Sequence, residues 1–138
     1  MPVSQNKVVT PQTPRSSSGV ATAANTAYGD SPTNAVVIFT AGANGARVSK
    51  ISAVARASVG ATELQLYRDH DGSGTTKRFV RSKTLAAVTV SQTAGQDPVD
   101  FGYSDSAPMI LAAGEKLYGA AGVALAAGIV FIVEGADF

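Results

Sequence analysis

The sequence predicts an all-β protein, a β-sandwich or barrel preceded by an extended N-terminal arm. From residue 34 onward, short runs rich in β-branched and aromatic residues alternate with turn clusters of glycine, asparagine, aspartate and proline. About seven or eight such runs follow one another at intervals of roughly 8–15 residues, a spacing typical of sandwiches and barrels. No long window shows the 3.6-residue apolar period of an amphipathic helix.

The predicted arm comprises residues 1–33, and the sandwich domain residues 34–138. Residues 4–19 are rich in serine, threonine, proline and glutamine and have no sustained period. Such a composition buries too little apolar surface to offset its ordering entropy, so we expect an arm that becomes ordered on a partner. Residues 20–28 could add a strand at a sheet edge. The basic residues Lys7 and Arg15 are candidate contacts with the partner, and deletion of the arm is expected to leave a folded domain.

The first three strands are predicted at residues 35–40, 47–57 and 62–69. A turn of sequence Ala-Gly-Ala-Asn-Gly separates the first two. In the third, the period of two places Leu64 and Leu66 on the inward face. The same alternation places Gln65 and Tyr67 on the outward face.

The second half of the chain supplies the remaining strands. Residues 75–91 are long enough for two strands, or for one strand with a break near residues 83–86. Residues 99–104 alternate apolar and polar side chains, as a half-buried strand does. The last two strands are expected at residues 116–121 and 125–134. The final one is apolar on both faces, which is typical of a central strand.

Residues 117–133 contain no charged side chain and have the length of a short membrane-spanning helix. Three glycines dilute this run, and no basic residue flanks its end. We therefore expect buried strands here and no membrane partner. Residues 1–10 are polar and lack an apolar core, so no secretory signal is expected either.

The composition points to a protein that faces other proteins. Charged residues make up only 15% of the chain, against about 25% in an ordinary soluble domain. The net charge is +1, so no overall field attracts nucleic acid. There is no cysteine, which excludes disulfides, thiolate metal sites and cysteine nucleophiles.

Residues 69–74, Asp-His-Asp-Gly-Ser-Gly, imitate the start of a calcium loop. The twelfth position, where such a loop needs a glutamate, is Val80, and strands rather than helices flank the segment. We expect a solvated hairpin tip, with a weak divalent site as the alternative. His70, the single histidine, has neither a nucleophile nor an orienting group nearby in the sequence. We therefore predict no catalytic residue, no metal ligand, no cofactor and no enzymatic activity.

Four basic residues cluster in the following strand: Lys77, Arg78, Arg81 and Lys83. On a regular strand, Lys77, Arg81 and Lys83 would share a face with Phe79. A nucleic-acid surface would combine such cations with aromatic stacking, but the near-neutral chain argues against it. A solvated strand face and a contact patch for an acidic protein surface remain the two interpretations.

Three segments carry a resemblance to a known family. Residues 40–45 read Thr-Ala-Gly-Ala-Asn-Gly, residues 111–118 read Leu-Ala-Ala-Gly-Glu-Lys-Leu-Tyr, and the chain closes on Gly-Ala-Asp-Phe. The arrangement resembles that of tailed-bacteriophage head decoration (cement) proteins and related head or tail accessory proteins, over residues 34–138. The resemblance implies a jelly roll in which Gly114 and Glu115 form a turn, while Leu117 and Tyr118 straddle the next strand.

The resemblance also implies a function. Decoration proteins sit on the outer capsid surface as trimers and clamp neighbouring capsid subunits, so the implied partners are the major capsid protein and further copies of this chain. Synthesis would take place in the bacterial cytoplasm, and Lys77, Arg78, Arg81 and Lys83 would be candidate capsid contacts. One rival is a receptor- or glycan-binding module of a tail fibre or baseplate, which the lack of tryptophan and the presence of only four tyrosines disfavour. A head–tail accessory protein is the other rival.

Overall fold

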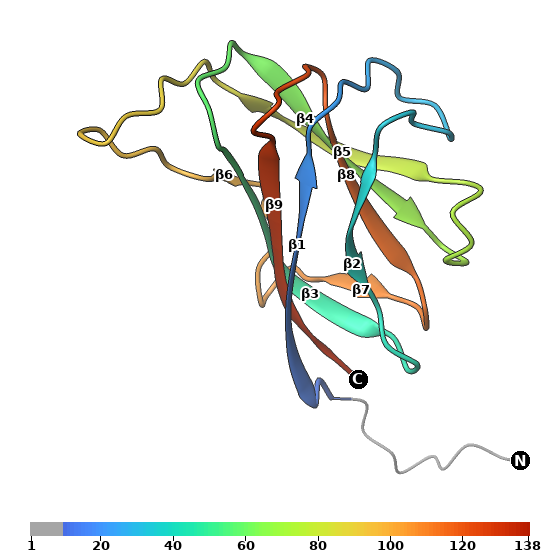
Figure 1. Ribbon diagram of the computed structural model, residues 1–138. Coiled ribbons are helices and arrows are strands. Elements are labelled where there is room, and N and C mark those ends of the chain that lie inside the picture. The colour runs from blue at the N-terminus through green and yellow to red at the C-terminus, as the bar shows by residue number, and fades with distance from the viewer. Residues whose placement is uncertain (1–9) are drawn as a thin grey trace, which may run out of the picture.

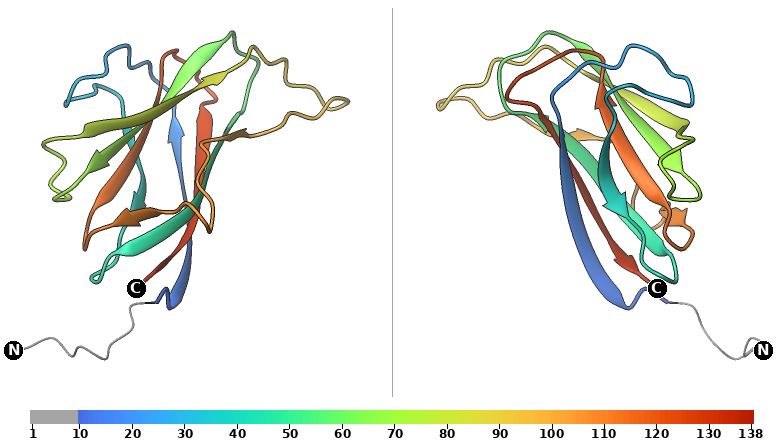
Figure 2. Two further views of the ribbon diagram at one scale, coloured as in Figure 1. Left: turned by 180° about the vertical axis from the view of Figure 1, so that it is seen from behind. Right: turned by 45° about the vertical axis from the view of Figure 1, so that its right-hand side comes forward.

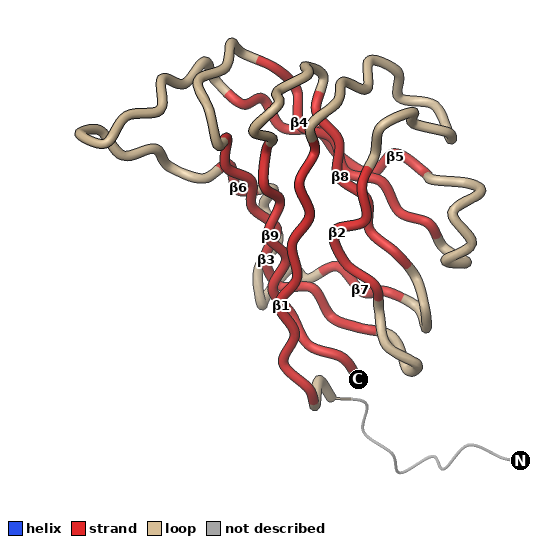
Figure 3. Tube along the Cα trace, in the orientation of Figure 1, coloured by secondary structure: helices blue, strands red, loops and turns tan. Residues whose placement is uncertain are grey.

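The computed structural model describes residues 10–138, which form nine strands in two antiparallel sheets packed against each other (Figure 1, Figure 3). The predicted all-β sandwich is confirmed. The strands are β1 (Thr13–Ala21), β2 (Val36–Thr40), β3 (Ala46–Ala55), β4 (Thr62–Asp69), β5 (Arg78–Leu85), β6 (Val99–Asp100), β7 (Met109–Leu111), β8 (Lys116–Ala121) and β9 (Ile129–Asp137). No helix long and apolar enough to cross a membrane occurs in this part of the chain.

The strand order is that of a jelly roll. Sheet A has the order β1-β9-β3-β6, with β7 also paired to β3, and sheet B has the order β2-β8-β4-β5. Along the chain, β4 and β5 form a hairpin within sheet B, whereas most other connections cross from one sheet to the other. This winding of two Greek keys is the arrangement that defines the jelly roll.

The core lies between the two sheets and follows the predicted alternation. On sheet B, Leu64 and Leu66 point inward and are fully buried. On sheet A, Phe131 of β9 meets them from the opposite side, within one continuous apolar cluster. Strand β9 lies between β1 and β3, so its two-sided apolar sequence is that of a central strand, as predicted.

The predicted arm boundary at residue 34 needs correction, because β1 is part of the sandwich. Residues Thr13 to Ala21 pair in register with Asp137 to Ile129, along the full length of β9 (Figure 2). An edge strand gains backbone hydrogen bonds on one side and needs few apolar side chains, so its polar composition is misleading. Small residues suit its inner face, since a Cβ on Gly19 would lie 2.6 Å from the Val37 carbonyl oxygen of β2. Lys7 lies outside the described residues.

Three further differences concern the second half of the chain. Residues 75–91 contain one strand, β5, followed by a loop at residues 86–98 that stands away from the sandwich (Figure 1). Strand β6 is shorter than the predicted run, although Phe101 still turns inward and is fully buried. Strand β7 was not predicted, because three residues are too few to show a period.

The segments that carry the family resemblance meet at one end of the sandwich. The backbone N–H of Gly114 donates to the Gly42 carbonyl at 3.2 Å, and the N–H of Gly42 donates to the Asp137 carboxylate at 3.2 Å. Gly45 has a φ of 86°, and a Cβ there would lie 2.4 Å from the Leu111 carbonyl oxygen. Because these glycines have no side chain, the turns can pack closely against one another.

The turn expected at Gly114 and Glu115 is also present, closed by a hydrogen bond from the Glu115 N–H to the Ala112 carbonyl at 3.1 Å. Gly114 has a φ of 70°, in the left-handed region that favours glycine. Beyond it, Leu117 points into the core and Tyr118 to the opposite face of sheet B, as the resemblance implied.

Candidate interaction surfaces

The structure separates the four clustered basic residues. The Lys77 ammonium donates to the Gly74 carbonyl at 2.9 Å and lies 4.9 Å from the centre of the Tyr118 ring, so it is held over the outer face of sheet B. Arg78 forms an ion pair with Asp30 at 2.5 Å, and both side chains are more than half exposed. Such an exposed pair contributes little to stability.

Arg81 points to the other face of the strand because β5 contains a bulge. Tyr67 is paired with Phe79 and Leu66 with Arg81, which leaves Val80 as the extra residue. The prediction that Arg81 and Lys83 share a face with Phe79 is therefore wrong. Lys83 is paired with Leu64, so it lies on the core-facing side of sheet B. It is exposed there because β5 is the edge strand.

The guanidinium of Arg81 links the edge strand of sheet B to the segment that follows β6 in sheet A. It donates to the Phe101 carbonyl at 2.5 Å and lies 4.7 Å from the centre of the Tyr103 ring. Both partners follow β6, so one side chain joins β5 of sheet B to the edge of sheet A. This contact gives Arg81 a structural role.

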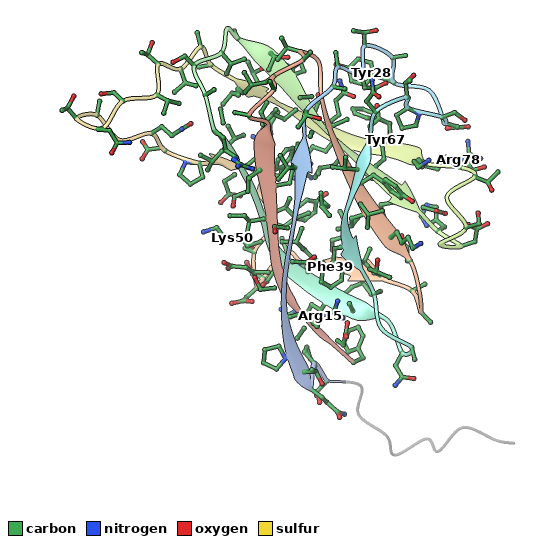
Figure 4. All side chains as sticks on the ribbon, in the orientation of Figure 1. Arg15, Tyr28, Phe39, Lys50, Tyr67 and Arg78 are labelled. Atoms are coloured by element: carbon green, nitrogen blue, oxygen red, sulfur yellow. The ribbon has the colours of Figure 1, made fainter. Side chains whose placement is uncertain are left out.

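Arg15 likewise binds within its own chain. Its guanidinium forms an ion pair with Asp137 at 2.5 Å, donates to the Thr40 carbonyl at 3.2 Å and lies over the Phe39 ring (Figure 4). These three contacts tie β1 to β9 and to the end of β2. The interpretation of Arg15 as a contact of a free arm is corrected accordingly.

The tip of the β4–β5 hairpin is ordered by its own carboxylates. The buried Asp69 carboxylate accepts hydrogen bonds from the N–H groups of Gly72 and Gly74, at 3.1 and 2.5 Å. Hydrogen bonds, first of all from the Ser73 backbone N–H, lower the pKa of the exposed Asp71 carboxyl to about 2. The hairpin tip is thus present as predicted. Between residues 10 and 138, no three His, Cys, Asp or Glu side chains gather as a metal-binding group.

Glu115 is a buried carboxylate at the base of the same hairpin. It accepts hydrogen bonds from the Arg68 guanidinium at 2.6 Å and from the Ala112 N–H at 2.9 Å, and the His70 Nδ1 lies 3.3 Å away. Burial alone would raise the pKa of Glu115. The hydrogen bonds from Arg68 and Ala112 and the nearby positive charges outweigh burial, so the net shift of the pKa is downward.

The outer face of sheet B carries a buried polar network. Gln65 and Tyr67 face away from the core, as predicted, yet both are buried because part of the β1–β2 connection covers them. The Asn25 side-chain amide donates to the Gln65 side-chain Oε1 at 2.6 Å and to the Tyr67 hydroxyl at 3.0 Å. Desolvation by burial raises the pKa of Tyr67. Local alternation cannot reveal this cover, which comes from a distant segment.

Two aromatic rings remain exposed at the edge of this face. Tyr28 is 49% exposed and Phe79 is 40% exposed, and their ring centres lie 4.8 Å apart at an interplanar angle of 69°. Tyr67 supports the Phe79 ring from behind, at 5.8 Å. No short-range sequence pattern marks this pair, because Tyr28 and Phe79 are distant in the chain.

The outer face of sheet A is a different kind of surface. At one end, Val20, Val130 and Val54 form a cross-strand row, and the next row contains Ile132 between serines of β1 and β3. Charges begin farther along the sheet, with Lys50 opposite Glu134 (Figure 4). On β1, β9 and β3 these two rows carry no charged side chain, and the exposed Asp100 of β6 lies opposite Ser52 at the edge of the second row.

Comparisons of this chain with protein-family models, with curated proteins and with solved structures found no match.

Proposed function

We propose that this chain is a structural virion protein that decorates the capsid of a tailed bacteriophage and stabilises it by bridging neighbouring capsid subunits. The observation that carries the proposal is the pair of uncharged rows that β1, β9 and β3 form on the outer face of sheet A, in a jelly roll whose turn segments resemble those of decoration proteins. Jelly rolls are common in viral capsid proteins, although a fold alone does not define a function.

The two uncharged rows of sheet A suit a protein partner. Their side chains are Val20, Val54, Val130 and Ile132, together with the serines beside Ile132, and Asp100 of β6 lies at their rim. Interface cores are depleted in charged residues, because a charge that loses water must find a partner. Three paired strands hold this face in a fixed shape, so little conformational entropy is lost on binding.

Two buried carboxylates of the sandwich, Asp69 and Glu115, and the half-buried Asp137 are engaged in structural contacts. Asp69 holds the hairpin loop, Asp137 binds Arg15, and Glu115 binds Arg68. These contacts favour a role in which the domain must persist as a rigid unit on a particle.

The proposed mechanism is stabilisation by mass action. A protein that binds the assembled shell but not its separated subunits raises the free energy needed to lose the shell. If the chain forms the proposed trimer, three weak contacts act at high effective concentration and bind the particle more tightly than one.

Cryo-electron microscopy of the virion that carries this chain tests the proposal. We expect density for the jelly roll in many symmetric copies on the capsid, with neighbouring copies grouped in threes. Density confined to the tail tip or to a single vertex would overturn the capsid role and favour the receptor-binding or head–tail alternatives.

A variant tests the contact face. Val130→Lys introduces a charge into the two uncharged rows of sheet A, and we expect it to remain folded but to lose binding to particles that lack the native protein. Thr84→Lys, at an exposed position of β5 in sheet B, is the matched control and should bind normally. Equal binding by both variants would exclude the outer face of sheet A as the contact.

A further inference from the structure

The exposed pair of Tyr28 and Phe79 has the properties of a preorganised platform. A backbone hydrogen bond of 2.8 Å from the Lys77 N–H to the Asp30 carbonyl fixes one end of the Tyr28 turn. The other end is fixed by the Ala27 carbonyl, which accepts from the Tyr67 hydroxyl at 3.0 Å and from the Asn25 amide at 2.9 Å. Tyr28 therefore presents its ring from an anchored segment, which lowers the entropic cost of binding.

The geometry of the two rings exposes apolar surface in two directions. At 69° they meet in an edge-to-face arrangement, so they do not cover each other as stacked rings would. Tyr67 and Tyr118 lie beside Phe79 in the same cross-strand row, and both are buried. Among these four aromatic side chains, only Tyr28 and Phe79 retain a large accessible surface.

Polar groups adjoin this platform through Arg78. The Arg78 side chain pairs with Asp30, two residues after Tyr28, and also lines an open pocket of about 230 Å³. The other lining residues are Asp69, His70, Asp71 and Thr76. Hydrogen-bond donors and acceptors are thus both available around Arg78, the neighbour of Phe79 in the chain.

The charges of this region indicate which ligands would be excluded. The Arg78 guanidinium is already paired with Asp30, the Lys77 ammonium is bound to the Gly74 carbonyl, and Asp71 is an exposed carboxylate of the pocket. An anionic ligand would therefore have to displace an ion pair beside a further negative charge. A wholly apolar ligand would leave the polar groups of the pocket without partners.

We propose that Tyr28, Phe79 and Arg78, with the adjoining pocket, form a binding site for a neutral oligosaccharide. A sugar ring combines an apolar C–H face, which packs on an aromatic ring, with a rim of hydroxyl groups that both donate and accept hydrogen bonds. The rings supply the apolar surface, and the polar groups come from Arg78, Asp30 and the pocket that Arg78 lines. This site is separate from the outer face of sheet A and does not depend on the proposed capsid role.

Nuclear magnetic resonance titration of the ¹⁵N-labelled full chain tests this proposal. The probes are neutral tetrasaccharides of glucose, mannose, galactose and N-acetylglucosamine, with tetragalacturonate as the anionic comparison, each in the millimolar range. We expect at least one neutral sugar to shift the amide signals of residues 28–31 and 70–79, and tetragalacturonate to leave them unchanged. No shift with any neutral sugar, or a stronger response to the anionic one, would overturn the proposal.

Variants locate the site. Tyr28→Ala and Phe79→Leu should each weaken the binding of the responding sugar by about tenfold, the loss expected for one aromatic contact. Val37→Ala is the control, because Val37 is 43% exposed at the opposite edge of sheet B. The dispersed amide spectrum of each variant verifies that it is folded. Unchanged affinity in both aromatic variants would refute the assignment of the sugar site. Particle binding by Val130→Lys tests the proposed capsid contact and is independent of this result.

Discussion

Removal of the Glu115 carboxylate is the perturbation that the structure predicts most directly. The side chain is buried, with a relative exposure of 1%, in the turn between β7 and β8. It joins Arg68 of β4 to the Ala112 N–H, and thereby links the two sheets at the end where the turn segments meet. We consider Glu115→Gln and Glu115→Ala.

The magnitude follows from the two hydrogen bonds that the carboxylate accepts. A hydrogen bond to a charged group contributes about 1.5–3 kcal/mol, and an orphaned buried donor costs about 1–3 kcal/mol. Arg68 is 24% exposed and regains some hydration, which reduces the loss. We expect Glu115→Ala to lower the free energy of unfolding by about 3 kcal/mol. Glu115→Gln can keep the bond to Ala112, so about 1.5 kcal/mol is expected.

The pH dependence provides a second readout. Because the pKa of Glu115 is lowered from 4.5 in the folded state, the unfolded state binds more protons as the pH falls below that value. The carboxylate therefore contributes its full stability above pH 4.5 and loses it as the pH falls through the folded-state pKa. The difference between the native protein and Glu115→Gln should shrink over that acidic range.

Urea denaturation followed by circular dichroism measures both effects, at neutral pH and at several acidic pH values. Glu134→Gln is the matched control, because Glu134 is exposed on β9 and its removal should change the free energy of unfolding by no more than about 0.5 kcal/mol. If Glu115→Ala proved as stable as this control, or if its deficit did not depend on pH, the assigned role of the carboxylate would be wrong.

Three further predictions concern the strands and their connections. Deletion of residues 1–21 removes β1 and leaves one edge of β9 unpaired, so circular dichroism and light scattering should reveal an unfolded or aggregated chain; a cooperative, monodisperse domain would contradict this. Asn25→Ala leaves buried polar partners unsatisfied and should cost about 2–3 kcal/mol in urea denaturation, whereas the exposed Thr26→Ala should have little effect. Gly45→Ala introduces both a strained φ and a clash with a backbone carbonyl, so its thermal midpoint should fall clearly; Gly60→Ala, with open space around its Cβ position, should leave the midpoint nearly unchanged.

Strands with one apolar face were the part of the fold that could be predicted from sequence. The bounds of β4 match the predicted residues 62–69, because its leucines alternate against the core. The central position of β9 followed from its two-sided apolar composition. Both features depend on short-range patterns that the core enforces directly.

The candidate surfaces depend on contacts that local patterns do not encode. Tyr67 alternates as an outward residue, but a segment some forty positions earlier covers it. The face on which Arg81 lies depends on a bulge at Val80, and one extra residue reverses every later side chain of the strand. Strand β1 escaped prediction because its backbone pairing with β9 matters more than its polar composition.

The central position of β9 has a consequence for the order of events during synthesis. Strand β1 leaves the ribosome early, yet its partner β9 follows only after more than a hundred further residues, as the 122-residue separation of Arg15 and Asp137 illustrates. Strands β1 and β3 also have no direct pairing in sheet A without β9 between them. Pairings of such long sequence separation fold slowly. We therefore expect nascent chains stalled before residue 129 to be sensitive to protease and to bind chaperones, and full-length chains to acquire protection in a single late step.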